Sequence, residues 1–244
     1  LTSAKKRLSL EEVVRLKHSY RMLLADRVKP DLLAALRRAG DTALAPGIAV
    51  LEGWDNTAAP DSRGGTLFEA WWRRYVQGRR PAERFAEPWT QERPTATPRG
   101  LADPAGAVAA FREAAAEVRE RFGSLDVAWG ETHRVRIAGK DLPVGGCGGD
   151  LGCFRVLQFR RDPDGRFAVQ GGDGWVLAVE FGDTPRAVSV LGYGQSIRTD
   201  SPFHGDQAEL FARGELKPVY FGWSDVETNA VTRYRPGETP SRSR

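Results

Sequence analysis

The apolar periodicity of the chain changes near Ser124, and this change limits the folds that the sequence can adopt. Before that point, apolar residues recur at intervals of three and four, which is typical of amphipathic helices. Beyond it, short alternating runs separated by glycine- and proline-containing turns indicate β-strands. Helices followed by strands predict an α+β fold. We expect a mainly helical region over residues 1–124, a strand-rich region over residues 125–237 and a tail over residues 238–244.

The first region opens with a helix start. Ser9 and Glu12 have the spacing of a capping box, and a broad apolar stripe follows over residues 10–24. Because proline lacks the N–H that a helix interior uses, Pro30 is expected to end this helix and to precede a short second helix over residues 32–40.

Three further helices are predicted before residue 125. One covers about residues 42–54, an aromatic one covers residues 67–76, and the last runs from an Asp103 cap to a Gly123 stop. The aromatic helix carries large side chains at spacings that share a face, namely Phe68, Trp71, Trp72 and Tyr75. Core packing is the expected duty of these aromatics. A proline-rich connector is expected over residues 79–104.

The second region predicts short strands joined by tight turns. The expected strands cover residues 134–137, 154–160, 167–169, 175–181, 187–191 and 230–234, with a short helix over residues 207–212. Strands in series through short turns predict an antiparallel meander within one larger sheet. The run over residues 175–181 is almost continuously apolar, which favours burial on both faces.

Composition excludes several classes of protein. The chain is 41% apolar, too high for a disordered protein, and its apolar runs are strand-sized, so no membrane span is expected. Its net charge of +4 comes from basic and acidic residues mixed along the chain. A nucleic-acid-binding protein usually concentrates its basic residues on one face, so no nucleic-acid partner is expected.

The two cysteines leave alternatives open. Cys147 and Cys153 can form a local disulfide in an oxidising compartment, or can remain thiols in a reducing one. Two sulfurs are too few for a structural zinc site, and His18, His133 and His204 lie far apart in the sequence. We therefore expect no metal and no cofactor.

No catalytic motif stands out. The Gly-x-Ser-x-Gly turn of a serine hydrolase is absent, and nothing in the sequence brings a cysteine to a histidine. The glycine-rich segment over residues 145–152 lacks the Gly-Lys-Ser/Thr end of a phosphate-binding loop. The pair most like an enzyme site is His204 with Asp206, for which a structural hydrogen bond that holds a turn is the favoured interpretation.

Several segments, taken in order, resemble the penicillin acylase superfamily, and within it the acyl-homoserine-lactone acylases and aculeacin-type lipopeptide acylases. The resemblance is collinear over about residues 8–237. It rests on Trp54-Asp55, Asp61-Ser62-Arg63-Gly64 and Leu67-Phe68, on Trp129-Gly130-Glu131, His133-Arg134 and Leu142-Pro143-Val144-Gly145-Gly146, on Asp173-Gly174-Trp175-Val176-Leu177, and on Tyr193-Gly194-Gln195-Ser196, residues 201–207 and residues 210–219.

The chain departs from the family pattern at one motif. The family's usual Ser-Pro-His-Tyr-x-Asp-Gln reads Ser-Pro-Phe-His-Gly-Asp-Gln here, so Phe203 stands at the usual His position and His204 at the usual Tyr. Any polar role that the family's His plays is therefore not assigned to Phe203. His204, Asp206 and Gln207 are assigned a supporting or structural role.

The resemblance implies an αββα fold and an N-terminal-nucleophile hydrolase whose precursor cuts itself into α- and β-chains. The N-terminal Ser of the β-chain then attacks the amide, with its own α-amine as base and with backbone and Asn donors at the oxyanion. All of these groups belong to β-chain positions before the matched segment, so no catalytic residue is expected here. Leu1 has no hydroxyl or thiol, and Gly123-Ser124, although similar to a cleavage junction, is better explained as a helix stop.

The sequence therefore predicts the C-terminal portion of the β-chain of an N-acyl amidohydrolase, secreted or periplasmic and inactive alone. The expected partners are the α-chain, the N-terminal part of the β-chain and a small acylated substrate. The alternative is a non-catalytic binding or scaffold protein that retains this half of the fold. A stand-alone enzyme with a Cys or His site ranks last.

Overall fold

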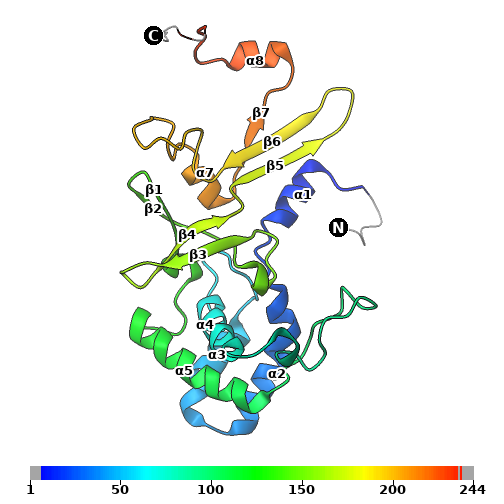
Figure 1. Ribbon diagram of the computed structural model, residues 1–244, viewed down its shortest axis with the longest axis vertical. Coiled ribbons are helices and arrows are strands. Elements are labelled where there is room, and N and C mark those ends of the chain that lie inside the picture. The colour runs from blue at the N-terminus through cyan, green and yellow to red at the C-terminus, as the bar shows by residue number, and fades with distance from the viewer. Residues whose placement is uncertain (1–6, 236, 238–244) are drawn as a thin grey trace.

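The computed structural model describes residues 7–235 and 237, and its four longest helices lie together at one end of the long axis, with the strands beyond them (Figure 1). The helices are α1 (Leu10–Lys17), α2 (Leu23–Ala39), α3 (Ala45–Gly53), α4 (Gly65–Val76), α5 (Pro104–Phe122), α6 (Trp129–Thr132), α7 (Ala208–Arg213) and α8 (Trp223–Asn229). Short 3-10 turns lie at Thr42–Leu44, Pro81–Glu83 and Gly149–Leu151. We call α2–α5 the helical body. No helix in the described residues is long and apolar enough to cross a membrane.

The strands of the described residues belong to two sheets. They are β1 (His133–Ile137), β2 (Lys140–Pro143), β3 (Leu157–Arg161), β4 (Phe167–Gly172), β5 (Trp175–Glu180), β6 (Arg186–Leu191) and β7 (Lys217–Val219). One sheet has the order β2-β1-β4-β3, with β1 and β4 parallel, and the other has the order β5-β6-β7, all antiparallel. We call the second the upper sheet. The predicted α+β class is confirmed.

The start of the chain is only partly as predicted. The capping box is present, because the Ser9 amide donates to the Glu12 carboxylate at 2.8 Å and the Glu12 amide donates to Ser9 Oγ at 3.1 Å. The stripe over residues 10–24 does not form one helix, however. At Tyr20 the backbone has a φ of 54°, and its carbonyl accepts from the Ala58 amide at 2.8 Å. At Tyr20 the backbone thus bonds to a loop distant in sequence, where a continuous helix would have its next turn.

Pro30 does not end a helix, so that prediction is wrong. It lies inside α2, which continues to a left-handed Gly40. Pro30 costs α2 one backbone hydrogen bond and a steric clash, roughly 3 kcal/mol. The helix nevertheless buries a full apolar stripe against the rest of the helical body, formed by Leu24, Ala25, Val28, Leu32, Ala35 and Leu36. Tertiary packing therefore overrides the local preference.

The aromatic helix and the long helix are as predicted. α4 and α5 pack side by side, and the Trp71 indole donates to the Ala107 carbonyl at 3.0 Å. The four aromatic residues of the shared face of α4 are all buried. Asp103 caps α5 by accepting from the Gly106 amide at 2.8 Å, and Gly123 ends it in the left-handed conformation. The segment between the two helices is irregular, as expected.

The predicted meander is wrong, because the chain changes sheet between β4 and β5. β4 pairs with β3 and β1, whereas β5 pairs only with β6 among the described residues. The change follows Gly172, which has a φ of 105° and passes so close to β3 that a Cβ would lie 2.3 Å from the Val156 carbonyl oxygen. Only glycine allows the backbone this approach.

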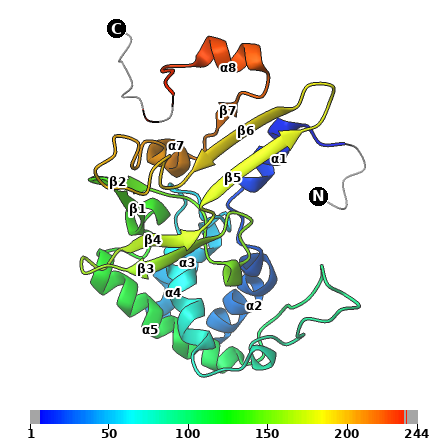
Figure 2. The same cartoon turned by 45° about the horizontal axis from the view of Figure 1, so that its top comes forward.

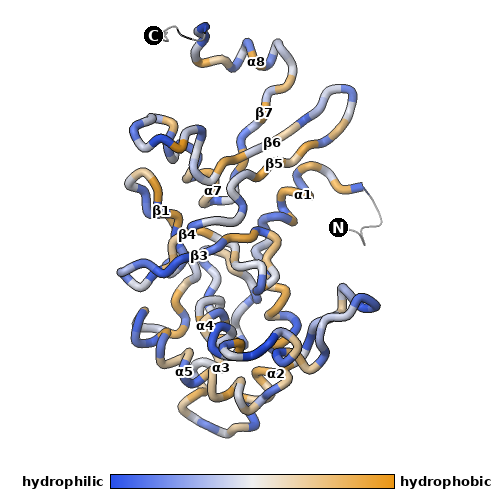
Figure 3. Tube along the Cα trace, in the orientation of Figure 1, coloured by the Kyte–Doolittle hydropathy of each residue, from blue (hydrophilic) through white to orange (hydrophobic). Residues whose placement is uncertain are grey.

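The prediction that residues 175–181 are buried on both faces is also wrong for this chain. Val176 is buried, but Trp175 is 63% exposed, Leu177 43% and Val179 38%. These three side chains alternate with Val176 and Ala178, and so share the outer face of the upper sheet. We call this surface, together with Val219 of β7, the open face. Figure 3 shows the apolar character of β5.

The predicted last strand over residues 230–234 is absent. The chain instead forms β7 and then α8, and residues 230–235 are irregular. α8 buries none of its residues and stands at the far end of the molecule from the helical body (Figure 1). The residue pattern predicted a strand here, but in the described chain no neighbouring strand pairs with these residues.

Two apolar cores result. The larger lies among α2–α5 and extends to Trp129 and to both cysteines. The smaller lies between the two sheets and α7, and includes Val135, Leu157 and Phe211. Helix α1 stands apart from the helical body and covers the inner face of the upper sheet (Figure 2).

Candidate functional site

The residues singled out by sequence lie in the turn before α7. His204 Nδ1 donates to the Ser196 carbonyl at 3.1 Å, and an Asp206 carboxylate oxygen accepts from the Gln195 amide at 3.0 Å. Gly194 is required beside them, because a Cβ there would lie 2.2 Å from Asp206 Oδ1. No described hydrogen bond joins His204 to Asp206. Each binds backbone instead, which fits the structural interpretation of this pair.

Gln207 extends the same arrangement into the core. Its side chain is 4% exposed, and Oε1 accepts from the Leu191 amide at the end of β6 at 3.0 Å. Its Nε2 has no hydrogen-bond partner in the described structure. This bond joins the start of α7 to the end of β6, whereas the two preceding contacts lie within the loop that connects them. A supporting role in catalysis by these residues stays a prediction.

The cysteines are joined. Cys147 and Cys153 form a disulfide whose Cα atoms lie 5.5 Å apart, and both residues are buried. The alternative of two free thiols therefore does not hold in this structure, and neither cysteine is available as a nucleophile. Within the described residues, no group of three His, Cys, Asp or Glu side chains is placed to hold a metal ion.

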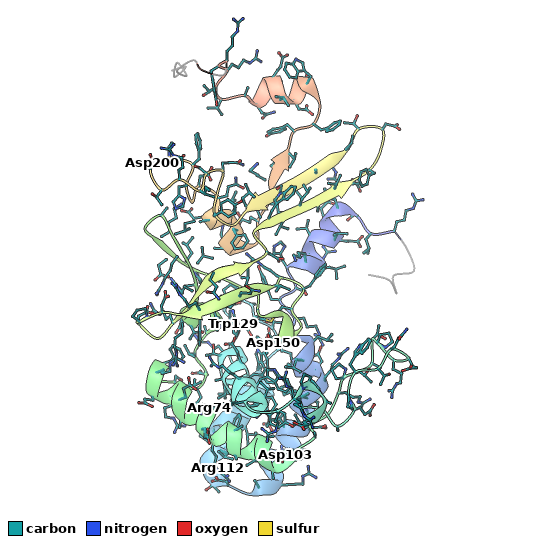
Figure 4. All side chains as sticks on the ribbon, in the orientation of Figure 1. Arg74, Asp103, Arg112, Trp129, Asp150 and Asp200 are labelled. Carbon is teal, nitrogen blue, oxygen red and sulfur yellow. A yellow bond between two sulfur atoms is a disulfide. The ribbon has the colours of Figure 1, made fainter. Side chains whose placement is uncertain are left out.

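The sequence did not single out a buried ion pair between β1 and α4. His133 is fully buried, and its Nε2 lies 3.1 Å from Glu69 Oε2. The imidazole stacks on Trp129 at 3.5 Å between ring centroids, with Phe167 stacked at 5.0 Å. Figure 4 labels Trp129 where the four-stranded sheet meets the helices. One signal was available, since Glu69 is the single carboxylate in the predicted aromatic helix over residues 67–76.

The electrostatics of this pair favour an ionised carboxylate. Burial by itself raises the pKa of Glu69, but the charge and hydrogen bond of His133 outweigh it, with help from Arg73 and Arg121. The pKa of Glu69 is therefore held below its usual value. On the other ring edge, His133 Nδ1 lies 2.8 Å from Thr132 Oγ1. The pair joins β1 to α4, and so is placed to hold the four-stranded sheet on the helices.

Arg155 was also missed. It is 1% exposed, and it donates to the Tyr20 hydroxyl at 3.2 Å and to the Phe211 carbonyl at the end of α7. Burial lowers the pKa of its guanidinium, and its Nε has no hydrogen-bond partner in the described structure. Through these bonds Arg155 joins the segment between α1 and α2 to α7.

Neither candidate for a nucleophile is supported. Leu1 lies outside the described residues. Gly123 has a φ of 76° and ends α5, and Ser124 Oγ donates to the Asp126 carboxylate in the next turn. The helix-stop interpretation of Gly123-Ser124 is thus the one that the geometry fits.

Comparison with known proteins decides the family. Residues 1–228 match the penicillin amidase family. The chain belongs to the penicillin amidase family. This confirms the resemblance inferred from the collinear motifs, and its mixed helix and strand content is consistent with the N-terminal-nucleophile hydrolase type of fold.

Individual relatives give the same assignment. The chain is 30% identical over 214 residues to acyl-homoserine lactone acylase PvdQ of Pseudomonas syringae pv. tomato, which covers 84% of this chain and 27% of that protein. It is 29% identical over 222 residues to aculeacin-A acylase of Actinoplanes utahensis, covering 85% and 26%. The chain therefore spans little more than a quarter of the length of these relatives.

A solved structure is also similar. Thermostable penicillin G acylase from Alcaligenes faecalis matches 97% of this chain and 51% of its own, with a TM-score of 0.48 and 17% identity.

Proposed function

We propose that this chain is the C-terminal portion of the β-chain of an N-acyl amidohydrolase. Its substrates are small acylated amines of the acyl-homoserine lactone, β-lactam or lipopeptide type, and its nucleophile is an N-terminal Ser outside the chain. The observation that carries the proposal is the match of residues 1–228 to the penicillin amidase family. The names of the relatives support an acyl amide as substrate.

The chemical groups that this chain presents indicate what it can contribute to the whole enzyme. Acyl transfer requires a nucleophile, a base and oxyanion donors within hydrogen-bond reach of one another. In the described residues both cysteines are bonded to each other, His133 is enclosed by aromatic rings, and His204 binds backbone. The role of this chain is therefore to complete the fold on which another part of the protein holds the reacting groups.

The open face supports a partner for that role. A soluble protein that functions alone seldom exposes a contiguous row of large apolar side chains. Trp175, Leu177 and Val179 form such a row on β5, and Val219 continues it on β7 across Ala187 of β6. We propose that the rest of the acylase, its α-chain and the N-terminal part of its β-chain, covers this row.

The disulfide supports the cellular location. Structural disulfides persist in oxidising compartments. The bond between Cys147 and Cys153 thus favours a secreted or periplasmic acylase. Synthesis as a precursor that cuts itself is a further part of the proposal, and it rests on the family match.

The experiment is to express the 244-residue chain alone and, separately, the whole gene product that contains it. Both are incubated with N-octanoyl homoserine lactone, and the released amine is measured. We expect turnover from the whole product and none from the chain. N-terminal sequencing of the active protein should find a polypeptide that begins with Ser and contains this chain.

Two results would contradict the proposal. One is turnover by the purified chain alone. The other is an inactive whole product without a Ser-initiated polypeptide, which would favour a non-catalytic scaffold. The open face is tested in the whole product by Leu177→Lys, with co-purification of the partner polypeptides as the readout. The control is Asp183→Lys, in the exposed turn that follows β5.

A further inference from the structure

A groove runs between α1 and the upper sheet, away from the sequence-predicted turn. It has a volume of about 590 Å³, which is within the range of small-molecule sites. Its walls are mostly apolar, contributed by Leu10 and Val14 of α1, Val188 of β6, and Leu216 and Pro218 beside β7. Such a surface favours the apolar part of a ligand.

Among the polar side chains that line this groove, His18 has a ring nitrogen whose role is fixed by a hydrogen bond. Its Nδ1 is 3.0 Å from the Val14 carbonyl oxygen. A carbonyl can only accept, so Nδ1 carries the proton, and Nε2 of the neutral ring keeps its lone pair. Within the described residues, no donor is recorded on Nε2, and that atom is not among the buried ones without a partner.

Gly214 lies beside the imidazole of His18. A Cβ on Gly214 would lie 2.5 Å from Tyr20 Oη and 2.9 Å from His18 Cδ2, the carbon bonded to Nε2. A larger residue would therefore crowd this edge of the ring, whereas glycine leaves room beside it. Because His18 lines the groove and no donor from the described residues is recorded on its Nε2, this nitrogen is an available acceptor at the groove.

The surroundings keep this imidazole neutral. Burial lowers the pKa of His18, and the positive charges of Arg155 and Lys17 lower it further. At neutral pH the ring is thus an acceptor at Nε2 and not a cation. A ligand that bonds this nitrogen must bring an N–H or O–H donor, which a carboxylate lacks.

Charged residues stand at the mouth. Glu11 of α1 pairs with Arg186 of β6 at 2.6 Å and joins the two walls of the groove. The hydrogen bond from Arg186 lowers the pKa of Glu11 to about 2, so the pair stays ionised throughout the neutral range. This contact fixes the spacing of α1 from the sheet and leaves the apolar interior to the ligand.

We propose that this groove binds a small apolar molecule whose N–H or O–H donates a hydrogen bond to His18 Nε2, with a secondary alkyl amide as the simplest example. The proposal does not depend on the acylase function proposed above.

The test uses the protein with every polypeptide that co-purifies with it. A diazirine-bearing analogue of N-methyloctanamide is photo-crosslinked, and labelled peptides are mapped. The competitors are N-methyloctanamide, which has one N–H, and N,N-dimethyloctanamide, which has none. We expect label on residues 10–18 or 186–188, and the secondary amide should compete roughly three- to tenfold better, the value of one hydrogen bond.

His18→Asn isolates the contact. The Asn side chain can still donate to the Val14 carbonyl, but it has no counterpart of Nε2. We expect this variant to lose the preference for the secondary amide, while His204→Asn, in the turn before α7, keeps it.

Three outcomes would overturn the proposal. Both amides could compete equally in the unmodified protein, or His18→Asn could keep the preference. The groove peptides could also remain unlabelled, with crosslinks from them to another polypeptide, which would mean that a protein segment fills the groove.

Discussion

The helical body and the upper sheet both carry rows of large apolar side chains, but this chain covers only the row in the helical body. Phe68 and Trp71 of α4 are fully buried, and the Trp71 indole has a carbonyl partner. On β5, Trp175 is 63% exposed and Leu177 is 43% exposed. Large apolar side chains thus form a completed core in one region and an uncovered surface in the other.

The difference lies in which neighbours the chain supplies. α4 has α5 against it for its whole length, joined by a connector of the same polypeptide. The upper sheet has α1 and α7 on its inner face, and no described element covers its outer face. A row of apolar residues therefore indicates that a surface must be buried. It does not indicate which polypeptide covers that surface.

The largest effect is expected in the helical body. Trp71→Ala removes a fully buried indole and its hydrogen bond, so the free energy of unfolding should fall by about 3–5 kcal/mol. Urea denaturation followed by circular dichroism measures this. A loss below about 1 kcal/mol would mean that the core around α4 is loosely packed, and would break the comparison.

Next comes the disulfide, which closes a short loop against the start of α2. Replacing Cys147 and Cys153 together by Ala should lower the free energy of unfolding by about 2 kcal/mol, because the unfolded chain regains loop entropy. The same assay measures it, and intact mass with and without reductant checks the bond in the unmodified chain. If reductant adds no pair of hydrogens, the bond is absent in solution.

The ion pair beneath the four-stranded sheet should have a smaller, pH-dependent effect. The pKa of Glu69 is lowered in the folded state, so its carboxylate adds stability above its unfolded value near 4.5. That stability is lost as pH falls through the lower folded pKa. Glu69→Gln should therefore cost roughly 1–2 kcal/mol at pH 7, and the cost should shrink as the pH is lowered below 4.5. A cost that does not change with pH would contradict the pair.

The smallest effect is expected on the open face and α8. Leu177→Ser and Trp223→Ala should each change the stability of the chain alone by no more than about 0.5 kcal/mol, because both side chains are already exposed. Losses comparable to that of Trp71→Ala would show that the upper sheet completes its own core, and the contrast between the regions would fail.

Predictions from local signals were largely correct. The Ser9 capping box, the aromatic α4, and α5 between Asp103 and Gly123 follow from caps and spacing that involve only neighbouring residues. Failures occurred where a distant segment competes. Pro30 remains within α2 because burial of the apolar stripe of this helix contributes more stability than the lost backbone hydrogen bond removes.

The candidate site shows the same division. His204, Asp206 and Gln207 could be named from a motif, but their backbone partners in residues 191–196 could not. Glu69 and His133 are 64 residues apart, and Tyr20 and Arg155 are 135 apart. No rule of sequence spacing relates residues so far apart. These buried contacts therefore could not be predicted before the fold was known.

By itself the sequence determined the family, the α+β class and the change from helices to strands near Ser124, because these depend on residue order and local periodicity. The tertiary structure decided that the strands divide into two sheets at Gly172, that the cysteines bond, and that α1 leaves a groove over His18. These depend on contacts between distant segments. Packing free energy sets such contacts, and no local pattern encodes it.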